Sequence, residues 1–401
     1  MFLYFGKVIK IPSAWGCGRS STRTIATAVK HVKKGKSSRS KIDKHKTSIL
    51  KRRALQGEEE TNKGHIFKLM YPWKTKLQLA EHLKSTEVYN SGGLIALCKP
   101  YGIAQVRGVS SDSGPQTVVQ ILNSGGIPDH VPTVGATIPV LKELYGASHL
   151  EVIRSAERWS SGLMLLCTSP ELADKVHKSL RRSRTLQQPP LTYWAVTVSL
   201  PQPVSAASKA ACKLEYVNNI GKVPVILKNY TQASLKRGEV KLSVVEHQTL
   251  IYNKNTGAAL VEVNTHSARW HFLRVWLAHS FSPILGDALY SSRVKMIAGK
   301  KLHVSPHNLT SYEPQMIPEE LYSKLELPSQ AKDMIPCHLH LAKVRLAQFN
   351  NDKSDLIISA QPPDFFMWTC RQLGLMSSED SAAETNCDST QGKENAGPPP
   401  P

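Results

Sequence analysis

The sequence lacks any long hydrophobic run. No apolar stretch of the 401-residue chain approaches the eighteen or so residues that a membrane-spanning helix needs. Cysteine is scarce as well, because the seven cysteines are scattered and no two form a Cys-x-x-Cys pair. This spacing argues against a zinc module or a disulfide framework and favours a reducing interior. The chain also has no internal repeat and no Gly-rich phosphate loop.

One short stretch, Cys337-His338-Leu339-His340, gathers residue types that bind metals. In a strand, alternation would place His338 and His340 on one face and Cys337 on the other. The three side chains would then not converge, so we expect no metal site here.

Acidic residues are nearly absent from the first part of the chain. Residues 1–57 hold fifteen Lys or Arg and the single acid Asp43, so they supply +14 of the net charge of +20. This composition, also rich in serine, is typical of a mitochondrial transit peptide and predicts a location in the mitochondrial matrix. A disordered basic arm that contacts RNA or directs nuclear import is the alternative.

The rest of the chain divides into three parts by composition. We expect a linker and a leading helix over 58–91, a folded domain over 92–372, and a disordered acidic, proline-ending tail over 373–401. Thr75-x-x-Gln78 is a capping-box pattern that starts the leading helix. Short apolar strands and helices alternate without regular β-α-β spacing, which predicts an α+β fold with a mainly antiparallel sheet.

Residues 192–200 alternate as a strand does. The alternation places Tyr193 on the face opposite to Trp194, Val196, Val198 and Leu200, so we expect Tyr193 to point towards water or a cleft. Further along, residues 267–279 have helical spacing. It predicts a buried stripe that begins at Trp270, with His271 and Arg274 neighbours on another face.

Basic residues also gather at the end of a helix that Ser169-Pro170 would cap. The helix carries Lys175, Lys178, Arg181, Arg182 and Arg184. Such a run can be a solvated helix end that the dipole favours, or a surface that contacts RNA phosphates.

A candidate catalytic acid lies in the run Arg154 to Leu166, which holds one carboxylate, Glu157, shortly before Ser161-Gly162. By itself Glu157 beside Arg158 is also the pattern of a solvated ion pair. Four segments in order make the stronger case: Lys99-Pro100-Tyr101-Gly102, the Glu157 run, Thr192-Tyr193-Trp194-Ala195, and Ser267 to Arg274 followed by Pro283-Ile284-Leu285-Gly286-Asp287 and Tyr290. Together they resemble the RluA-type pseudouridine synthase family from about residue 92 to 372.

The resemblance implies a pseudouridine synthase catalytic fold, with flanking helices and a central RNA-binding cleft. It implies a cofactor-free isomerisation of uridine in RNA, in which Glu157 acts on the ribose, Tyr193 stacks on the flipped uracil, and Arg274 pairs with the carboxylate. Further candidate substrate-binding residues are Lys99, Gly102, Arg154, Ser161, Gly162, Arg269, His271, Arg181 and Arg182. Mitochondrial mRNA or ribosomal RNA would be the partner, with RNA-granule or ribosome-assembly proteins as further candidates.

The chain departs from the family pattern at the acid itself, because His-Arg-Leu-Asp is replaced by Arg154-Ser155-Ala156-Glu157. The family arginine before the acid is lost at Ser155, and Arg154 is its candidate substitute. Glutamate is one methylene longer than aspartate, and a misplacement near 1 Å can cost about a hundredfold in rate. Two hypotheses follow: an active synthase that uses Glu157, or an RNA-binding or ribosome-assembly factor that keeps the fold without the activity.

Overall fold

The computed structural model describes residues 64–105, 132–217, 221–308, 315–328, 331 and 334–376. The basic segment 1–57 and the tail from 377 onward lie outside these residues, so the predictions made for them remain predictions. The helices of the described part are α2 (Lys76–Ser85), α4 (Val134–Tyr145), α5 (Pro170–Thr185), α6 (Gln232–Lys236), α7 (Phe272–His279), α8 (Glu319–Lys324) and α9 (Asp364–Gln372).

One large sheet organises the described residues, in the order β1-β2-β4-β12-β5-β9-β8-β6-β7, with β3 added to β4 and β13 to β12. The strands are β1 (Glu87–Ser91), β2 (Leu94–Lys99), β3 (Glu151–Ser155), β4 (Ser161–Cys167), β5 (Leu191–Thr197), β6 (Ser205–Val217), β7 (Gly221–Leu227), β8 (Val240–Tyr252), β9 (Ala259–Thr265), β12 (Leu339–Leu346) and β13 (Leu356–Ser359); β10 (Val294–Ile297) and β11 (Lys300–His303) form a separate hairpin. The pairing of β4 with β12 is parallel, and the other pairings are antiparallel. The predicted α+β fold with a mainly antiparallel sheet is confirmed.

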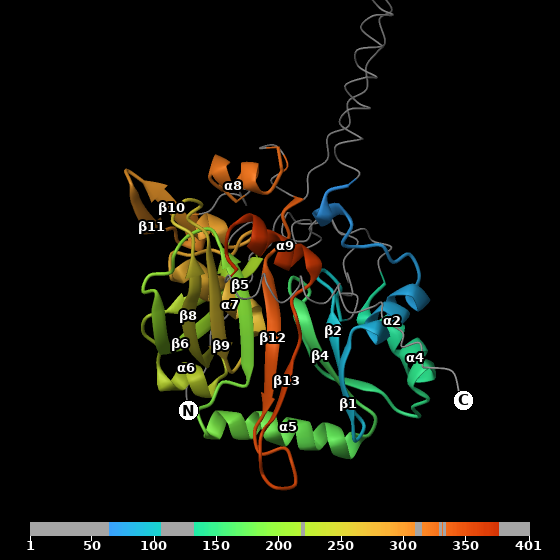
Figure 1. The fold of residues 1–401 in the computed structure, drawn as a ribbon. Coiled ribbons are helices and arrows are strands. Elements are labelled where there is room, and N and C mark those ends of the chain that lie inside the picture. The colour runs from blue at the N-terminus through green and yellow to red at the C-terminus, as the bar shows by residue number, and fades with distance from the viewer. Residues whose placement is uncertain are drawn as a thin grey trace, which may run out of the picture. The chain divides into compact units, whose positions relative to one another are not determined.

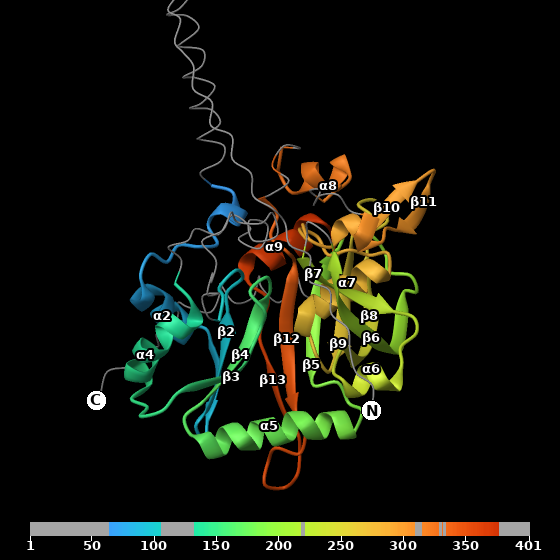
Figure 2. The same ribbon diagram turned by 180° about the vertical axis from the view of Figure 1, so that it is seen from behind.

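Helices lie at both ends and on the faces of this sheet. Figure 1 shows α5 across the lower end of the central strands and α9 at their opposite end. Helix α7 contacts β7 and lies against the half of the sheet that carries β8 and β9, as the reverse view shows (Figure 2). Helices α2 and α4 pack together beside β2.

Local signals predicted several of these elements. Thr75 and Gln78 form the expected capping box at the start of α2, whose Leu79, Ala80 and Leu83 are buried. The Ser169 side chain caps α5 with Pro170 in its first turn, also as predicted. Both motifs act within one helical turn, so the local sequence suffices to specify them.

The boundary predicted at residue 92 lies inside the folded unit. Strand β1 pairs with β2 through residues from Glu87 to Ser91, and Phe67 and Trp73 belong to the same hydrophobic core as the sheet. At the other end Leu375 is fully buried, so the fold extends beyond residue 372 as well.

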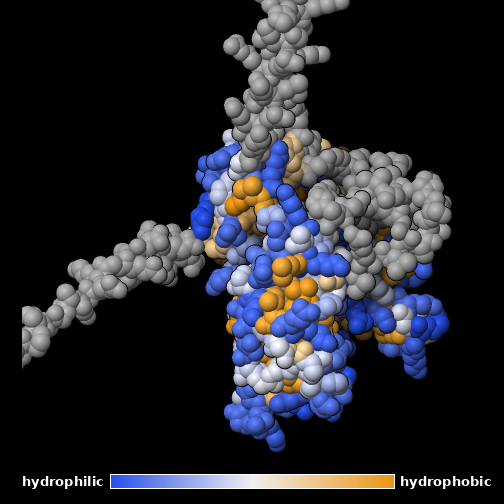
Figure 3. Space-filling model, turned by 90° about the vertical axis from the view of Figure 1, so that its right-hand side faces the viewer, coloured by the Kyte–Doolittle hydropathy of each residue, from blue (hydrophilic) through white to orange (hydrophobic). Residues whose placement is uncertain are grey.

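The face that carries α2 and α4 is mostly hydrophilic, with hydrophobic side chains gathered in a central band (Figure 3). Helix α4 has partly buried apolar side chains, among them Ile138, Val140 and Leu144.

In the part of the chain that the structure describes, no helix combines the length and the apolar character needed to cross a bilayer.

Candidate active site

Glu157 lies in the tight turn between β3 and β4. The backbone N–H and the hydroxyl of Ser160 both donate to the Glu157 carbonyl oxygen, each at 3.1 Å. The Gly102 N–H donates to the Arg158 carbonyl oxygen at 2.8 Å, which ties this turn to the Lys99–Gly102 segment. Two of the four sequence motifs therefore meet at the candidate acid, and Gly102 supports the turn through its backbone.

The Glu157 carboxyl group is enclosed by protein, although part of the residue remains accessible to solvent. Burial raises its pKa to about 7, against the opposing charges of Arg274, Arg154 and Lys99, which lower it. A carboxyl group that titrates near neutral pH can both accept and release a proton under physiological conditions, which is the property that acid–base chemistry requires.

Lys99 lies in the interior behind this turn. Its ammonium group donates to the carbonyl oxygens of Pro100, Ile103 and Ser160 at 2.9, 3.2 and 2.9 Å. The side chain has no exposed surface, and burial lowers its pKa to about 7. The structure thus gives Lys99 a part in shaping the turn and supplying charge, and its contact with substrate stays a prediction.

Ser161 and Gly162 are also fully enclosed. The Ser161 hydroxyl lies 2.9 Å from His340 Nδ1, and these two residues pair where β4 meets β12. Gly162 pairs with Leu341 at a φ of 117°, so close that a side chain would meet the Leu341 backbone. Their place in the motif reflects the parallel junction of the two strands, and their contacts with RNA stay a prediction.

Because of this close approach, Gly162→Ala tests whether the contact between Gly162 and the Leu341 backbone stabilises the fold. A Cβ at this position would lie 2.4 Å from the Leu341 carbonyl oxygen and 2.5 Å from its nitrogen, and backbone atoms cannot move aside as a side chain can. We expect a loss of more than about 1–3 kcal/mol in the free energy of unfolding, measured by chemical denaturation, because a clash is added to the backbone strain.

Gly146→Ala is the matched control. Gly146 has a φ of 60° but no atom within 4 Å of its would-be Cβ, so it isolates the strain from the clash. Equal losses in the two variants would contradict the proposed role of the contact with Leu341.

Tyr193 does not point towards water, contrary to the strand alternation. Only 1% of its surface is exposed, whereas Trp194 on the opposite face is partly exposed and donates to Glu262 at 3.2 Å. Burial raises the pKa of Tyr193 to about 12, and the nearby charge of Arg154 counteracts this while that of Glu157 adds to it. The prediction that Tyr193 points towards water was wrong, because the more deeply buried face of this strand is the one that carries Tyr193 and Ala195. The structure does bring Tyr193, Arg154 and Glu157 together.

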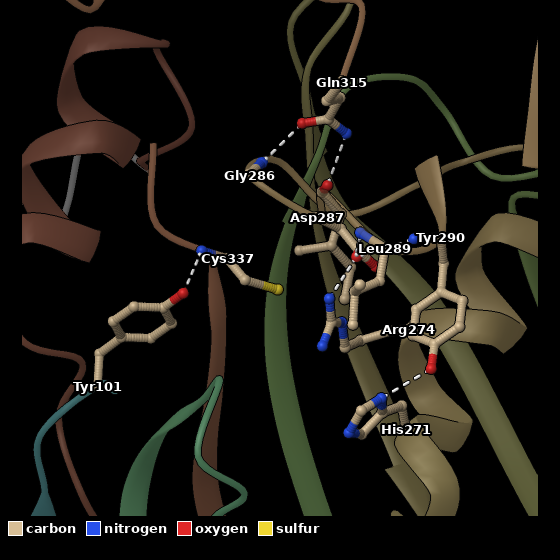
Figure 4. Close-up of polar contacts among 10 residues, drawn as sticks. Tyr101, His271, Arg274, Gly286, Asp287, Leu289, Tyr290, Gln315 and Cys337 are labelled. Carbon is tan, nitrogen blue, oxygen red and sulfur yellow. Dashed lines mark hydrogen bonds and ion pairs between the residues drawn. The ribbon is translucent and has the colours of Figure 1, made fainter. Parts of the chain in front are cut away.

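Arg274 has a different partner from the one the motif suggested. Its Nη2 donates to Asp287 Oδ1 at 2.5 Å, in a pair that is almost completely buried (Figure 4). Asp287 Oδ1 also accepts the backbone N–H groups of Leu289 and Tyr290, at 3.0 and 3.1 Å. The Glu157 carboxyl is affected by Arg274 as a nearby charge, and the ion pair itself is with Asp287.

Asp287 and Tyr290 contact the candidate site residues Arg274 and His271, and the sequence analysis gave neither of them a role. Both stand in the segment Pro283-Ile284-Leu285-Gly286-Asp287 and Tyr290 that the resemblance used, so the signal was present as a motif without an assigned role. The Tyr290 hydroxyl lies 2.7 Å from His271 Nδ1, and the Tyr290 ring faces the Arg274 guanidinium at 5.0 Å. Burial lowers the pKa of His271 to about 4, so His271 is neutral at physiological pH.

Arg274 has buried hydrogen-bond donors that no acceptor among the described residues satisfies. Its Nε and Nη1 are buried without a hydrogen-bond partner, as is Asp287 Oδ2. Buried donors left unsatisfied are costly unless a ligand engages them. Close to this pair, the Tyr101 hydroxyl accepts the Cys337 N–H at 3.1 Å, and the Gly286 N–H donates to the Gln315 side-chain oxygen (Figure 4).

The described residues contain no cluster of three or more His, Cys, Asp or Glu side chains suited to a metal ion.

The remaining candidates divide between two places. Arg269 and His271 lead into α7, and His271 lies close enough to Arg274 for its charge to lower the pKa of the imidazole. The exposed Arg181 and Arg182 lie on α5, where Arg182 donates to the Gln348 carbonyl at 3.2 Å, just beyond the last residue of β12. Glu157 lies near the first residues of that strand, so Arg181 and Arg182 do not join the site around it.

The pKa of Glu157 leads to a prediction about pH. If the ionised carboxylate is the active form, kcat/KM rises with pH and levels off above a midpoint near 7, because the group is protonated below its pKa. Arg154→Gln removes a charge that lowers this pKa, so the midpoint should move to higher pH. Lys99 titrates in the same range, but Arg154 is not among the charges that shift it. A profile flat from pH 6 to 8, or one that Arg154→Gln leaves in place, would contradict the assignment to Glu157.

No family model matches the chain. Among individual proteins, the human mitochondrial mRNA pseudouridine synthase RPUSD3 is 29% identical over 299 residues, which cover 74% of this chain and 78% of that protein. The bovine mitochondrial pseudouridylate synthase RPUSD4 is 26% identical and covers 76% and 74%. The resemblance inferred from the four motifs is thus confirmed by similarity along three quarters of the chain.

A solved structure shares the fold. The structure of human RNA pseudouridylate synthase domain containing 4 superposes with a TM-score of 0.53 at 22% identity, covering 75% of this chain and 97% of that one. The sheet and its flanking helices are therefore those of a known architecture, on which the candidate site is built.

Proposed function

We propose that this chain, a relative of the RluA-type pseudouridine synthases, converts uridine to pseudouridine in mitochondrial RNA. The observation that carries the proposal is the position of Glu157: a carboxyl group with a pKa near 7, enclosed among Arg274, Arg154 and Lys99, beside the phenol of Tyr193. Its relatives bear the names of mitochondrial synthases that modify RNA.

In the proposed reaction, the target uridine is extruded from the RNA into this site. The bond between ribose C1′ and uracil N1 breaks with the help of the Glu157 carboxylate, which acts at C1′ as a nucleophile or at C2′ as a base. The uracil turns, C5 bonds to C1′, and the proton on C5 leaves while N1 gains one. No atom is gained or lost, so the reaction needs no cofactor.

The other residues support this chemistry through charge and position. Arg154 lies near both Tyr193 and Glu157, so it is placed to help the flipped base enter. Arg274, oriented by Asp287, offers its buried Nε and Nη1 to the substrate. Tyr193 forms the wall against which the uracil packs. We further propose the mitochondrial matrix as the location, mRNA or ribosomal RNA as the substrate, and RNA-granule or ribosome-assembly proteins as partners.

The enclosed carboxyl group also argues against an inactive RNA-binding factor. Burying an ionisable group next to an RNA-binding surface costs free energy and adds a negative charge that repels phosphates. In a protein that only bound RNA, replacing Glu157 by an uncharged residue would therefore raise both its stability and its affinity for RNA.

Pseudouridine mapping in cells tests the proposal. Mitochondrial RNA from cells that lack the protein should lose specific pseudouridines, and the wild-type chain should restore them whereas Glu157→Ala should not. Sites that do not change on removal of the protein, or that return equally with Glu157→Ala, would overturn it.

A further inference from the structure

A basic pocket lies outside the residues that surround Glu157. It has a volume of about 430 Å³ and is formed by the end of α5, the middle of β6, the start of β8 and the segment that leads into α7. Its lining includes Arg184, Lys209, Lys241, Arg269 and Trp270, and Phe272 and Cys212 contribute buried apolar surface.

The four cations of this pocket come from four separate elements and converge on one space. No Asp or Glu is among the lining residues. Within the described ranges, none of Arg184, Lys209, Lys241 and Arg269 forms an ion pair. Positive charges that face one another across a concave surface repel, and an anion bound between them relieves that repulsion. The pocket is therefore suited to a phosphate group.

Trp270 adds an aromatic wall to this pocket. Trp270 and His271 are consecutive residues in the left-handed region, with φ of 61° and 53°. Such a conformation costs roughly 1–3 kcal/mol for each residue that is not glycine. The resulting turn sends His271 to the Tyr290 hydroxyl and leaves the partly exposed Trp270 at the pocket, ahead of the helix that was predicted to bury it.

An aromatic side chain next to several cations is the combination that binds single-stranded nucleic acid. Bases stack on the ring and the cations hold the phosphates, and the base must be unpaired to expose its face. Arg269 and Trp270 of the pocket precede α7, the helix that carries Arg274.

We propose that this pocket binds one unpaired nucleotide of the RNA, outside the site around Glu157. Trp270 stacks on its base, while Lys209, Lys241, Arg184 and Arg269 hold the phosphates on either side. The inference rests on the proposed function and deepens it, since it gives the synthase a second contact with its RNA that requires an unpaired base.

Equilibrium binding of a fluorescently labelled single-stranded RNA to the full chain tests this, measured by anisotropy at several salt concentrations. The double variant Lys209→Ala with Lys241→Ala should reduce the slope of log K against log salt by about 1.4, since each phosphate contact on a single strand contributes about 0.7. The matched control is Lys76→Ala with Lys254→Ala. Both control residues are exposed; Lys76 lies on α2 and Lys254 beyond the far end of β8. The control should leave the slope nearly unchanged.

Trp270→Ala should weaken binding of the single strand by about 5- to 100-fold, the range expected for the loss of one stacked base. Trp270→Phe should keep most of the affinity, because a smaller ring still stacks and preserves the packing. A Trp270→Ala variant that binds as well as wild type, or a charge pair that changes the slope no more than its control, would overturn the proposal. Equal loss for a fully paired duplex would also overturn the stacking role.

Activity measured on the same variants separates this inference from the proposed function. Trp270→Ala should raise KM for RNA and leave kcat near the wild-type value. If wild type forms no pseudouridine in any RNA, the proposed function fails, and the binding experiments still decide whether the pocket holds RNA. If wild type is active and the variants bind normally, the pocket alone is wrong.

Discussion

Glu157→Gln is expected to lower the rate constant for pseudouridine formation by about 10²- to 10⁴-fold, the contribution typical of a positioned acid or base. The amide has nearly the shape of the carboxyl group but cannot take up a proton or attack the ribose. Removal of a negative charge that lies among three cations should leave RNA binding intact or slightly tighter. Single-turnover kinetics with saturating enzyme measure the rate, and filter binding or anisotropy measures the affinity.

Glu157→Asp is the informative companion variant. The family motif has aspartate here, but the surrounding charges of this chain are arranged around the longer side chain. A retreat of the carboxylate by roughly 1 Å should therefore cost about a hundredfold in rate. An inactive wild type that gains activity as Glu157→Asp would show that the natural chain has lost catalysis, and the proposed activity would be wrong.

Asp287→Ala is expected to destabilise the protein by about 3–5 kcal/mol, because it leaves the Arg274 charge buried without its partner. The change also removes the acceptor for the N–H groups of Leu289 and Tyr290, so the turn before β10 should loosen. Unfolding in guanidinium chloride, followed by tryptophan fluorescence, gives the free energy.

Two variants provide the comparison for Asp287→Ala. Asp355→Ala breaks the partly exposed pair with Arg345 and should cost about 1 kcal/mol or less for the ion pair itself. The double change Arg274→Met with Asp287→Leu removes both charges and should recover part of the loss. Equal costs for Asp287→Ala and Asp355→Ala would contradict the importance of burial at this pair.

What the sequence by itself determined lies in short-range patterns and in the order of its motifs. The capping box of Thr75 and Gln78 and the Ser169 cap depend on residues within one helical turn, so they could be predicted without the fold. The four motifs in order led to the pseudouridine synthase architecture and to Glu157. The strand alternation around Tyr193 failed, because period 2 separates two faces but cannot tell which of them neighbouring elements cover.

Only the tertiary structure decided how the site is assembled. The parallel pairing of Ser161 with His340 joins residues far apart in the chain, and it explains why Ser161 and Gly162 are buried at a strand junction. The resemblance assigned Glu157 as the partner of Arg274, although the sequence also holds the carboxylate of Asp287. The fold places Asp287 within hydrogen-bonding distance and leaves Glu157 to act through charge, because the loop before β10 reaches α7 more closely than the turn before β4 does.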